Sequence, residues 1–189
     1  MLPAEIAEIR TERLAVRLVR HADLPALLEI NGDEQVTRYL PYDSWRSMED
    51  AQAWFDRAAA RHQAGDGRQF VIAPRATGEV IGACLLFRYE AAHARAEIGY
   101  LLGRRWWGAG YAQEATAALI GYAFEQLALR RIEADIDPLN LDSARLLERL
   151  GFSPEGLLRQ RWNVKGRTSD AAIYGLLRGE WSARVNDRR

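Results

Sequence analysis

The chain has 189 residues, of which 48% are hydrophobic and 28% charged, and its formal net charge is zero. Such values are typical of one soluble globular domain that buries a sizeable core. They argue against a protein that binds nucleic acid or a membrane through a basic face, and no apolar run approaches the ~20 residues that a membrane span needs. A single cysteine, Cys84, excludes an internal disulfide, and the first residues lack a signal-peptide pattern, so we expect a cytoplasmic protein.

The first quarter of the chain predicts one strand followed by helices. Residues 13–18 alternate apolar and polar side chains, as a half-buried strand does. Residues 21–30 have a helical pattern, and Asp23 is placed to cap that helix. A short helix is expected over 34–39 and a longer one over 47–62, where Ser-Met-Glu-Asp fits a capping box.

The middle of the chain predicts a hairpin and then a strand–helix–strand unit. Two apolar runs, 69–74 and 79–89, are joined by Ala-Thr-Gly, which favours an antiparallel pair. A strand through Glu97 then leads into a helix over 111–127, and residues 131–137 form the next strand.

The last quarter predicts a short helix over 141–150 that stops at Gly151, followed by two strand-like runs, 155–164 and 168–177. From Gly179 onward the pattern disappears, so we expect a frayed end.

These elements predict an α/β (α+β) fold. The expected architecture is a mixed, mostly antiparallel sheet with helices on both faces. No repeat or linker suggests a second domain, so residues 1–189 are taken as one domain with a core of about 11–181.

The stretch 97–115 reads as a strand, a glycine-rich turn and the first turn of a long helix. Backbone N–H groups at such a helix start lack partners, and with the helix dipole they form a seat for phosphate. Glycine also suits a plain strand–helix connection, and a dinucleotide site has a similar pattern. The third glycine of that fingerprint is missing, however, and the unit lies mid-chain.

Three motifs carry a resemblance to a known family. They are EIGYLL (97–102) with WGAGYAQEA (107–115), NLDSARLLERLGF (140–152), and a terminal hairpin in which GRTSD (166–170) precedes YGLLRGEW (174–181). In this order they resemble the GNAT superfamily of N-acetyltransferases, and within it the branch similar to the RimJ/RimL enzymes that acetylate protein N-termini.

The resemblance implies acetyl-CoA as co-substrate and no metal. The glycine loop would wrap the pyrophosphate, with Trp107 preferred over Arg105 as its opening position, and the preceding strand end would pair with the pantetheine arm. The coenzyme-binding residues implied are Tyr100, Leu101, Leu102, Trp107, Gly108, Ala109, Gly110, Tyr111, Ala112, Gln113, Asn140 and Ser143.

Catalysis needs an amine that has lost its proton, so a carboxylate in an apolar cleft is a candidate base. Glu97 is one candidate and Asp135 its rival, and water is a third. Glu97 is equally well explained as a surface residue paired with an arginine such as Arg95. Ser143 would hydrogen-bond or protonate the leaving thiolate, because Leu147 stands where many superfamily members carry a tyrosine.

The expected activity is transfer of an acetyl group to a primary amine by direct attack in a ternary complex. The acceptor is a protein N-terminus or a small-molecule amine, and neither nucleic acid nor a membrane is expected as a partner; a homodimer is left open. The alternatives are a non-catalytic acyl-CoA-binding protein and a dinucleotide-binding protein. Aromatic residues would shape the amine pocket or simply pack: Tyr39, Tyr42, Trp45 and Trp162.

Overall fold

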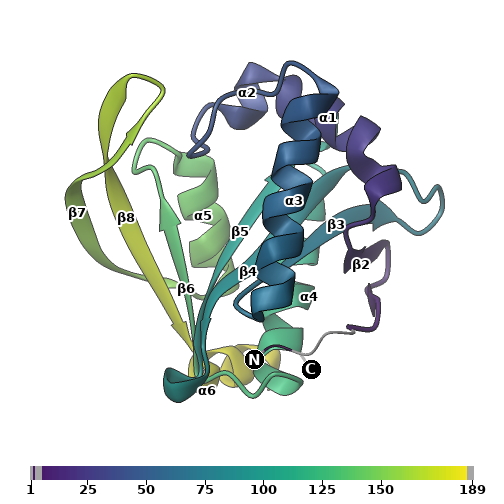
Figure 1. Cartoon of the computed structure of the whole chain (residues 1–189). Helices are drawn as coiled ribbons and strands as arrows, with labels where there is room; N and C mark the ends of the chain where they lie inside the picture. The colour runs from purple at the N-terminus through teal and green to yellow at the C-terminus, as the bar shows by residue number, and fades with distance from the viewer. Residues whose placement is uncertain (1, 3–5, 187–189) are drawn as a thin grey trace.

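The computed structural model describes residues 2 and 6–186, which form one mixed sheet with helices on both faces (Figure 1). The strands are β1 (Ile9–Arg10), β2 (Leu14–Leu18), β3 (Arg68–Pro74), β4 (Gly82–Glu90), β5 (Arg95–Leu102), β6 (Arg131–Ile136), β7 (Ser153–Val164) and β8 (Arg167–Leu177). They lie in the order β1-β2-β3-β4-β5-β6-β8-β7, and among these strands only β5 and β6 pair in parallel. The predicted mostly antiparallel sheet is confirmed.

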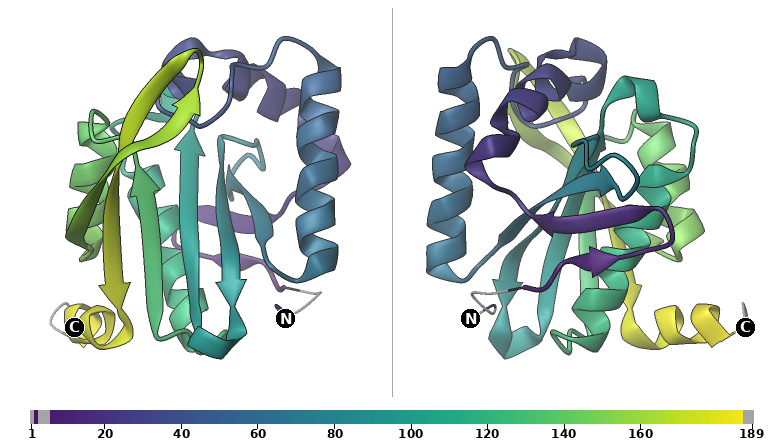
Figure 2. Two further views of the ribbon diagram at one scale, coloured as in Figure 1. Left: turned by 60° about the vertical axis from the view of Figure 1, so that its left-hand side comes forward. Right: turned by 90° about the vertical axis from the view of Figure 1, so that its right-hand side faces the viewer.

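Helices cover the two faces of this sheet separately (Figure 2). The α-helices are α1 (Leu24–Gly32), α2 (Glu34–Thr37), α3 (Met48–Ala64), α4 (Tyr111–Glu125), α5 (Leu141–Leu150) and α6 (Arg178–Asn186), and short 3-10 helices occupy His21–Asp23, Ala91–His93 and Arg104–Trp106. Helices α1 and α3 pack on one face, and α4 and α5 pack on the other.

Alternation along the strands divides the core between these two layers. In β3, Phe70 and Ile72 join the buried cluster of α4 and α5, whereas Val71 joins the cluster of α1 and α3. Successive strand side chains point to opposite faces, so a strand covered on both sides reads as a continuous apolar run. This explains why β3 is buried along its whole length.

Most local signals in the sequence act as predicted. Ser47 and Asp50 form the capping box of α3. Helix α5 ends at Gly151, whose φ of 99° is accessible to glycine without strain. Asp23 is an exception, because its side chain makes no capping bond to α1. It forms two 2.8 Å hydrogen bonds with the guanidinium of Arg17 instead.

The end of the chain also differs from the prediction. Where the sequence pattern disappears, helix α6 continues directly from β8, and residues 187–189 lie outside the described part. The Glu180 carboxylate accepts the Leu177 N–H at 2.8 Å, which supports the helix start. The Trp181 ring lies 6.5 Å from that of Phe124, so an aromatic contact with α4 fastens α6 to the domain.

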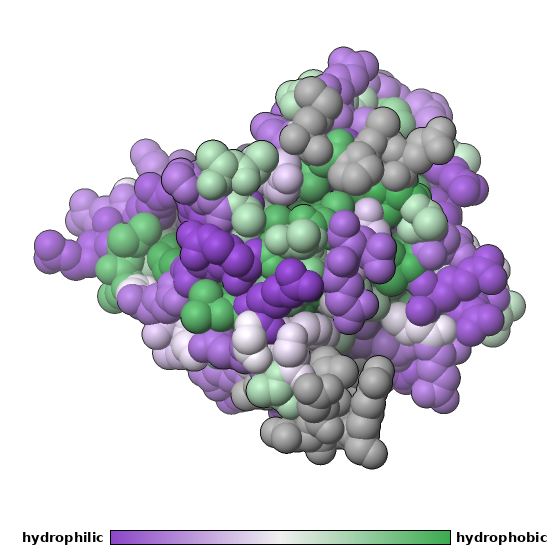
Figure 3. Space-filling model, turned by 90° about the horizontal axis from the view of Figure 1, so that it is seen from below, coloured by the Kyte–Doolittle hydropathy of each residue, from purple (hydrophilic) through white to green (hydrophobic). Residues whose placement is uncertain are grey.

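The face seen from below, where both chain ends lie, shows hydrophilic side chains interspersed with smaller apolar areas (Figure 3). Among the described residues, no helix combines the length and the apolar character needed to cross a membrane.

Candidate active site

The two parallel strands separate from each other part-way along the sheet. Strands β5 and β6 pair at three positions, the last being Glu97 with Glu133. Beyond that point β5 stays paired with β4, up to Leu102, and β6 stays paired with β8, up to Ile136. The sheet is therefore open between the carboxyl ends of β5 and β6.

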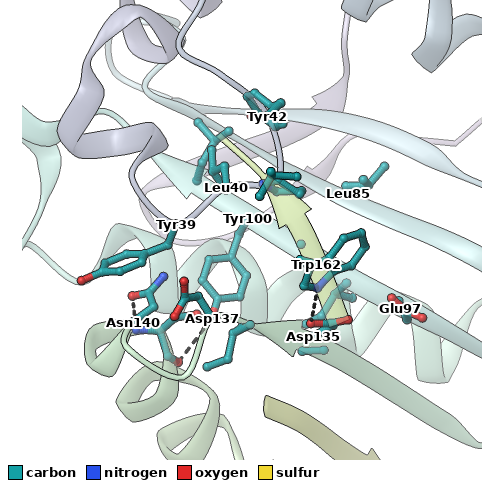
Figure 4. A pocket seen from close by; sticks show the side chains of 18 of the residues that line it. Tyr39, Leu40, Tyr42, Leu85, Glu97, Tyr100, Asp135, Asp137, Asn140 and Trp162 are labelled. Carbon is teal, nitrogen blue, oxygen red and sulfur yellow. Dashed lines mark hydrogen bonds between the residues drawn. The ribbon is translucent and has the colours of Figure 1, made fainter. Parts of the chain in front are cut away.

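A cavity of about 260 Å³ occupies this opening (Figure 4). Consecutive residues line it on both strands, 97–101 on β5 and 134–136 on β6. Because neighbouring side chains on a strand face opposite sides of the sheet, the cavity is lined from both faces. We call this cavity between β5 and β6 the passage.

Glu97 lines the passage but is engaged with an arginine. Both of its carboxylate oxygens accept from Nη1 of Arg88, at 2.7 and 2.9 Å. Arg88 has a φ of 50° at an irregularity in β4, where the register with β5 shifts. The ion pair expected for a structural Glu97 thus exists, although with Arg88 and not Arg95, which pairs with Glu90 and Glu133.

Asp135 lines the passage with a different set of partners. The Trp162 indole N–H donates to its Oδ1 at 3.2 Å (Figure 4), and none of the ion pairs in the described part of the chain includes it. Burial raises the pKa of Asp135, although the Trp162 hydrogen bond and the charges of Arg161 and Arg88 oppose that rise. The environment therefore makes Asp135 a stronger base than an ordinary aspartate.

Asn140, Ser143 and Tyr100 meet at the start of α5. The Asn140 Oδ1 accepts the Ser143 N–H at 3.1 Å and so caps the helix, the structural role expected for it. The Ser143 hydroxyl lies 2.6 Å from the Tyr100 hydroxyl, which reaches it from β5. Leu147 is fully buried in the core.

The glycine loop follows β5 and leads into α4. Gly108 and Gly110 have φ values of 76° and 79°, in the left-handed region that suits glycine. Helix α4 begins after Gly110 without a side-chain cap. In the described structure no hydrogen bond uses the backbone N–H groups of residues 108–113, so these donors are available at the positive end of the helix dipole.

The family model described as "Acetyltransferase (GNAT) domain" matches residues 13–153. The chain belongs to the GNAT superfamily. It is 38% identical over 172 residues to the uncharacterized N-acetyltransferase p20 of Bacillus licheniformis, covering 91% of this chain and 97% of that one. It is 27% identical over 183 residues to the ribosomal protein uS5-alanine N-acetyltransferase of Escherichia coli, covering 92% of each chain.

Solved structures agree with the family. A crystal structure of a putative acetyltransferase from T. thermophilus matches with a TM-score of 0.85 and 28% identity, covering 99% of both chains. The protein is thus an acetyltransferase enzyme with the GNAT fold, as the motifs predicted.

Sequence reasoning missed a set of side-chain contacts next to the glycine loop. Arg13 of the segment before β2 donates from Nη1 to the Ala109 carbonyl at 3.0 Å, and its guanidinium lies 4.5 Å from the Tyr111 ring centroid. Glu114, in the first turn of α4, accepts from Arg13 Nε, from the Arg13 backbone N–H and from the Thr11 hydroxyl. The motif contains Glu114, but nothing in the sequence points to a partner about one hundred residues away.

The predicted aromatic residues separate into two groups. Tyr39, Tyr42 and Trp162 line the passage. Trp45 is buried and packs with its ring centroid 5.4 Å from that of Trp54, so it belongs to the core. Trp107 is half exposed and lies outside the passage, where its indole N–H donates to the Leu102 carbonyl at 2.7 Å.

Cys84 lines the passage from β4 but is buried, and burial raises the pKa of its thiol. A thiol in this state is a poor nucleophile, which supports the expectation that no covalent acyl intermediate forms. Among the described residues, no group of three or more histidine, cysteine or acidic side chains is arranged to hold a metal ion.

Proposed function

We propose that this enzyme transfers an acetyl group from acetyl-CoA to a primary amine by direct attack within a ternary complex. The observation that carries the proposal is the passage between β5 and β6, which is lined from both faces of the sheet. A donor that enters from one face and an acceptor that enters from the other would meet there without a covalent enzyme intermediate.

For the donor, the free backbone N–H groups of residues 108–113 are the proposed pyrophosphate site. The pantetheine arm would then lie along the end of β5, where β6 no longer pairs with it. Because the Leu102 carbonyl already accepts from Trp107, we assign this edge to Tyr100 and Leu101, with Asn140 opposite them.

For the acceptor, we assign the role of general base to Asp135 rather than to Glu97. The guanidinium of Arg88 occupies both oxygens of Glu97. Asp135 has no such partner in the described ion pairs, and its raised pKa brings it nearer to that of an amine. An α-amine, with a pKa of about 8, needs less help than a lysine amine at about 10.4.

The chemistry follows from these assignments. Asp135, directly or through one water, takes a proton from the acceptor nitrogen as that nitrogen attacks the thioester carbonyl carbon. The new C–N bond forms, the C–S bond breaks, and its electron pair leaves with sulfur. An acceptor of the protein N-terminal kind is supported by the similarity to the uS5-alanine enzyme, and a small amine is the other class to test.

Replacing each carboxylate in turn tests whether Asp135 or Glu97 is the general base. We expect Asp135→Asn to lower kcat/KM by about 100-fold or more at neutral pH, within the usual range for a general base, while the Kd for acetyl-CoA is unchanged. Because the base acts only when ionised, the acidic limb of the wild-type pH–rate profile should disappear in this variant. Glu97→Gln is the matched control and should retain activity within about tenfold.

Three results would contradict the proposal. If Glu97→Gln abolishes turnover while Asp135→Asn does not, the base is misassigned. Parallel rather than intersecting initial-rate plots would indicate a covalent intermediate. If acetyl-CoA binds tightly but no amine in a broad panel of peptides and small amines is acetylated, amine transfer itself is refuted.

A further inference from the structure

One contact inside the passage is not used by the roles above. The Tyr100 phenol, carried by β5, lies 2.6 Å from the Ser143 hydroxyl on α5 and 3.4 Å from the Ser143 carbonyl oxygen. It therefore links β5 to the first turn of α5, the helix that follows β6, beside the opening beyond Glu97 (Figure 4). Both residues line the passage, and both are largely enclosed by protein.

We propose that Tyr100 is a positioning residue that aims the Ser143 hydroxyl proton at the sulfur of the thioester. The inference rests on the proposed function, because it concerns the leaving group of that reaction. In the proposed arrangement the Tyr100 hydroxyl donates a hydrogen bond to Ser143 Oγ, and the Ser143 hydroxyl donates its own proton into the passage.

Two observations favour this direction for the hydrogen bond. Burial raises the pKa of the Tyr100 phenol, so it keeps its proton and remains a donor. A phenol is also more acidic than an alcohol, which makes it the better donor of the two. Ser143 is held at a second point, because Asn140 caps its backbone N–H, so the hydroxyl is the part of Ser143 that Tyr100 must orient.

The chemistry balances without a new reagent. The C–S bond breaks with its electron pair on sulfur, and the proton lost by the amine goes to Asp135. The developing thiolate accepts a hydrogen bond from Ser143, whose oxygen accepts one from Tyr100, and donors in such a chain strengthen one another. The Tyr100 proton does not transfer, in keeping with its raised pKa.

Tyr100→Phe removes only the phenolic oxygen and keeps the ring and the backbone edge. We expect kcat to fall by about 10-fold with the Kd for acetyl-CoA unchanged, as for loss of a hydrogen bond that acts on a charge. The loss should shrink with an acetyl-CoA analogue whose thiol is more acidic, because that thiolate needs less stabilisation. Tyr122→Phe, which trims a half-buried tyrosine of α4 that does not line the passage, is the matched control and should retain wild-type kcat.

The double variant with Ser143→Ala identifies the route of the effect. If Tyr100 acts through Ser143, adding Tyr100→Phe to Ser143→Ala should change kcat less than about twofold. Three results would overturn the inference while the wild type still acetylates amines. The losses in kcat of the two single variants could add fully in the double variant, Tyr100→Phe could lose as much kcat with the analogue as with acetyl-CoA, or Tyr100→Phe could keep wild-type kcat. A wild type that acetylates none would refute the proposed function and this inference with it.

Discussion

Replacing Glu114 by glutamine tests whether the ion pair behind the glycine loop holds that loop in place. The Glu114 carboxylate accepts from the Thr11 hydroxyl at 2.5 Å, from the Arg13 backbone N–H at 3.0 Å and from Arg13 Nε at 2.6 Å. Its side chain is 19% exposed and that of Arg13 is 44% exposed. Glutamine keeps the shape but directs an NH₂ group at one of these donors.

The expected loss can be built from these contacts. The Arg13 ion pair is screened by solvent and contributes at most about 1 kcal/mol. A donor left without its acceptor in the less exposed part of the network adds about 1–3 kcal/mol. We therefore expect the free energy of unfolding to fall by about 2 kcal/mol, which for a chain of this size lowers Tm by about 4–8 °C.

Calorimetry at neutral pH measures this shift, and acetyl-CoA titration measures its effect on the loop. The Kd for acetyl-CoA should rise, because Arg13 also holds the Ala109 carbonyl. Glu125→Gln, at the exposed far end of α4, is the matched control and should move Tm by no more than about 2 °C. A Tm for Glu114→Gln as close to wild type as that of the control would refute the reasoning.

The same network has a defined pH dependence. Burial opposes ionisation of Glu114, but the hydrogen bonds from Thr11 and Arg13 outweigh it, so the folded-state pKa is lowered. A group with a lowered folded pKa stabilises the fold fully above its unfolded pKa of about 4.3 and loses that contribution as the pH falls through the folded value. The Tm gap between wild type and Glu114→Gln should thus be constant from about pH 8 to about 5.5 and narrow below about 4.3.

Two further changes test packing and chemistry around the passage. Gly82→Ala would bring a Cβ within 2.5 Å of the Leu101 carbonyl oxygen, so we expect a loss of about 2 kcal/mol or more in unfolding experiments, whereas Gly156→Ala meets no atom within 4 Å and should change little. Cys84→Ala should keep kcat within about threefold, since the buried thiol takes no part in the reaction; a loss of about 100-fold or more would revive a covalent route.

Helix ends could be predicted from the sequence where the residues that form the cap lie within a few positions of one another. Ser47 and Asp50 are three residues apart, and Gly151 directly follows the helix it ends. Helix α6 was missed for the opposite reason. Its residues have little helical pattern, and its main anchor is the Trp181 contact with Phe124, which lies far away in sequence.

The same distinction applies to the site. The sequence motifs identified the end of β5, the glycine loop and the start of α5, because each of these segments is contiguous in the chain. They did not reveal partners that only the tertiary fold brings together. The Tyr100–Ser143 contact spans 43 residues, and a bulge at Arg88 decides which arginine meets Glu97. The choice between Glu97 and Asp135 as base depends on such contacts.

The position of the passage follows from the topology. Helix α4 starts after β5, and α5 starts after β6, at the carboxyl ends of the two parallel strands. Both helices therefore begin beyond the end of the sheet at which the strands separate, α4 without a side-chain cap and α5 with Ser143 in its first turn. Continuous pairing of β5 with β6 beyond Glu97 would close the passage. We therefore attribute the site to the early end of that pairing more than to any single side chain, since β4 and β8 hold the two strands apart on their outer edges.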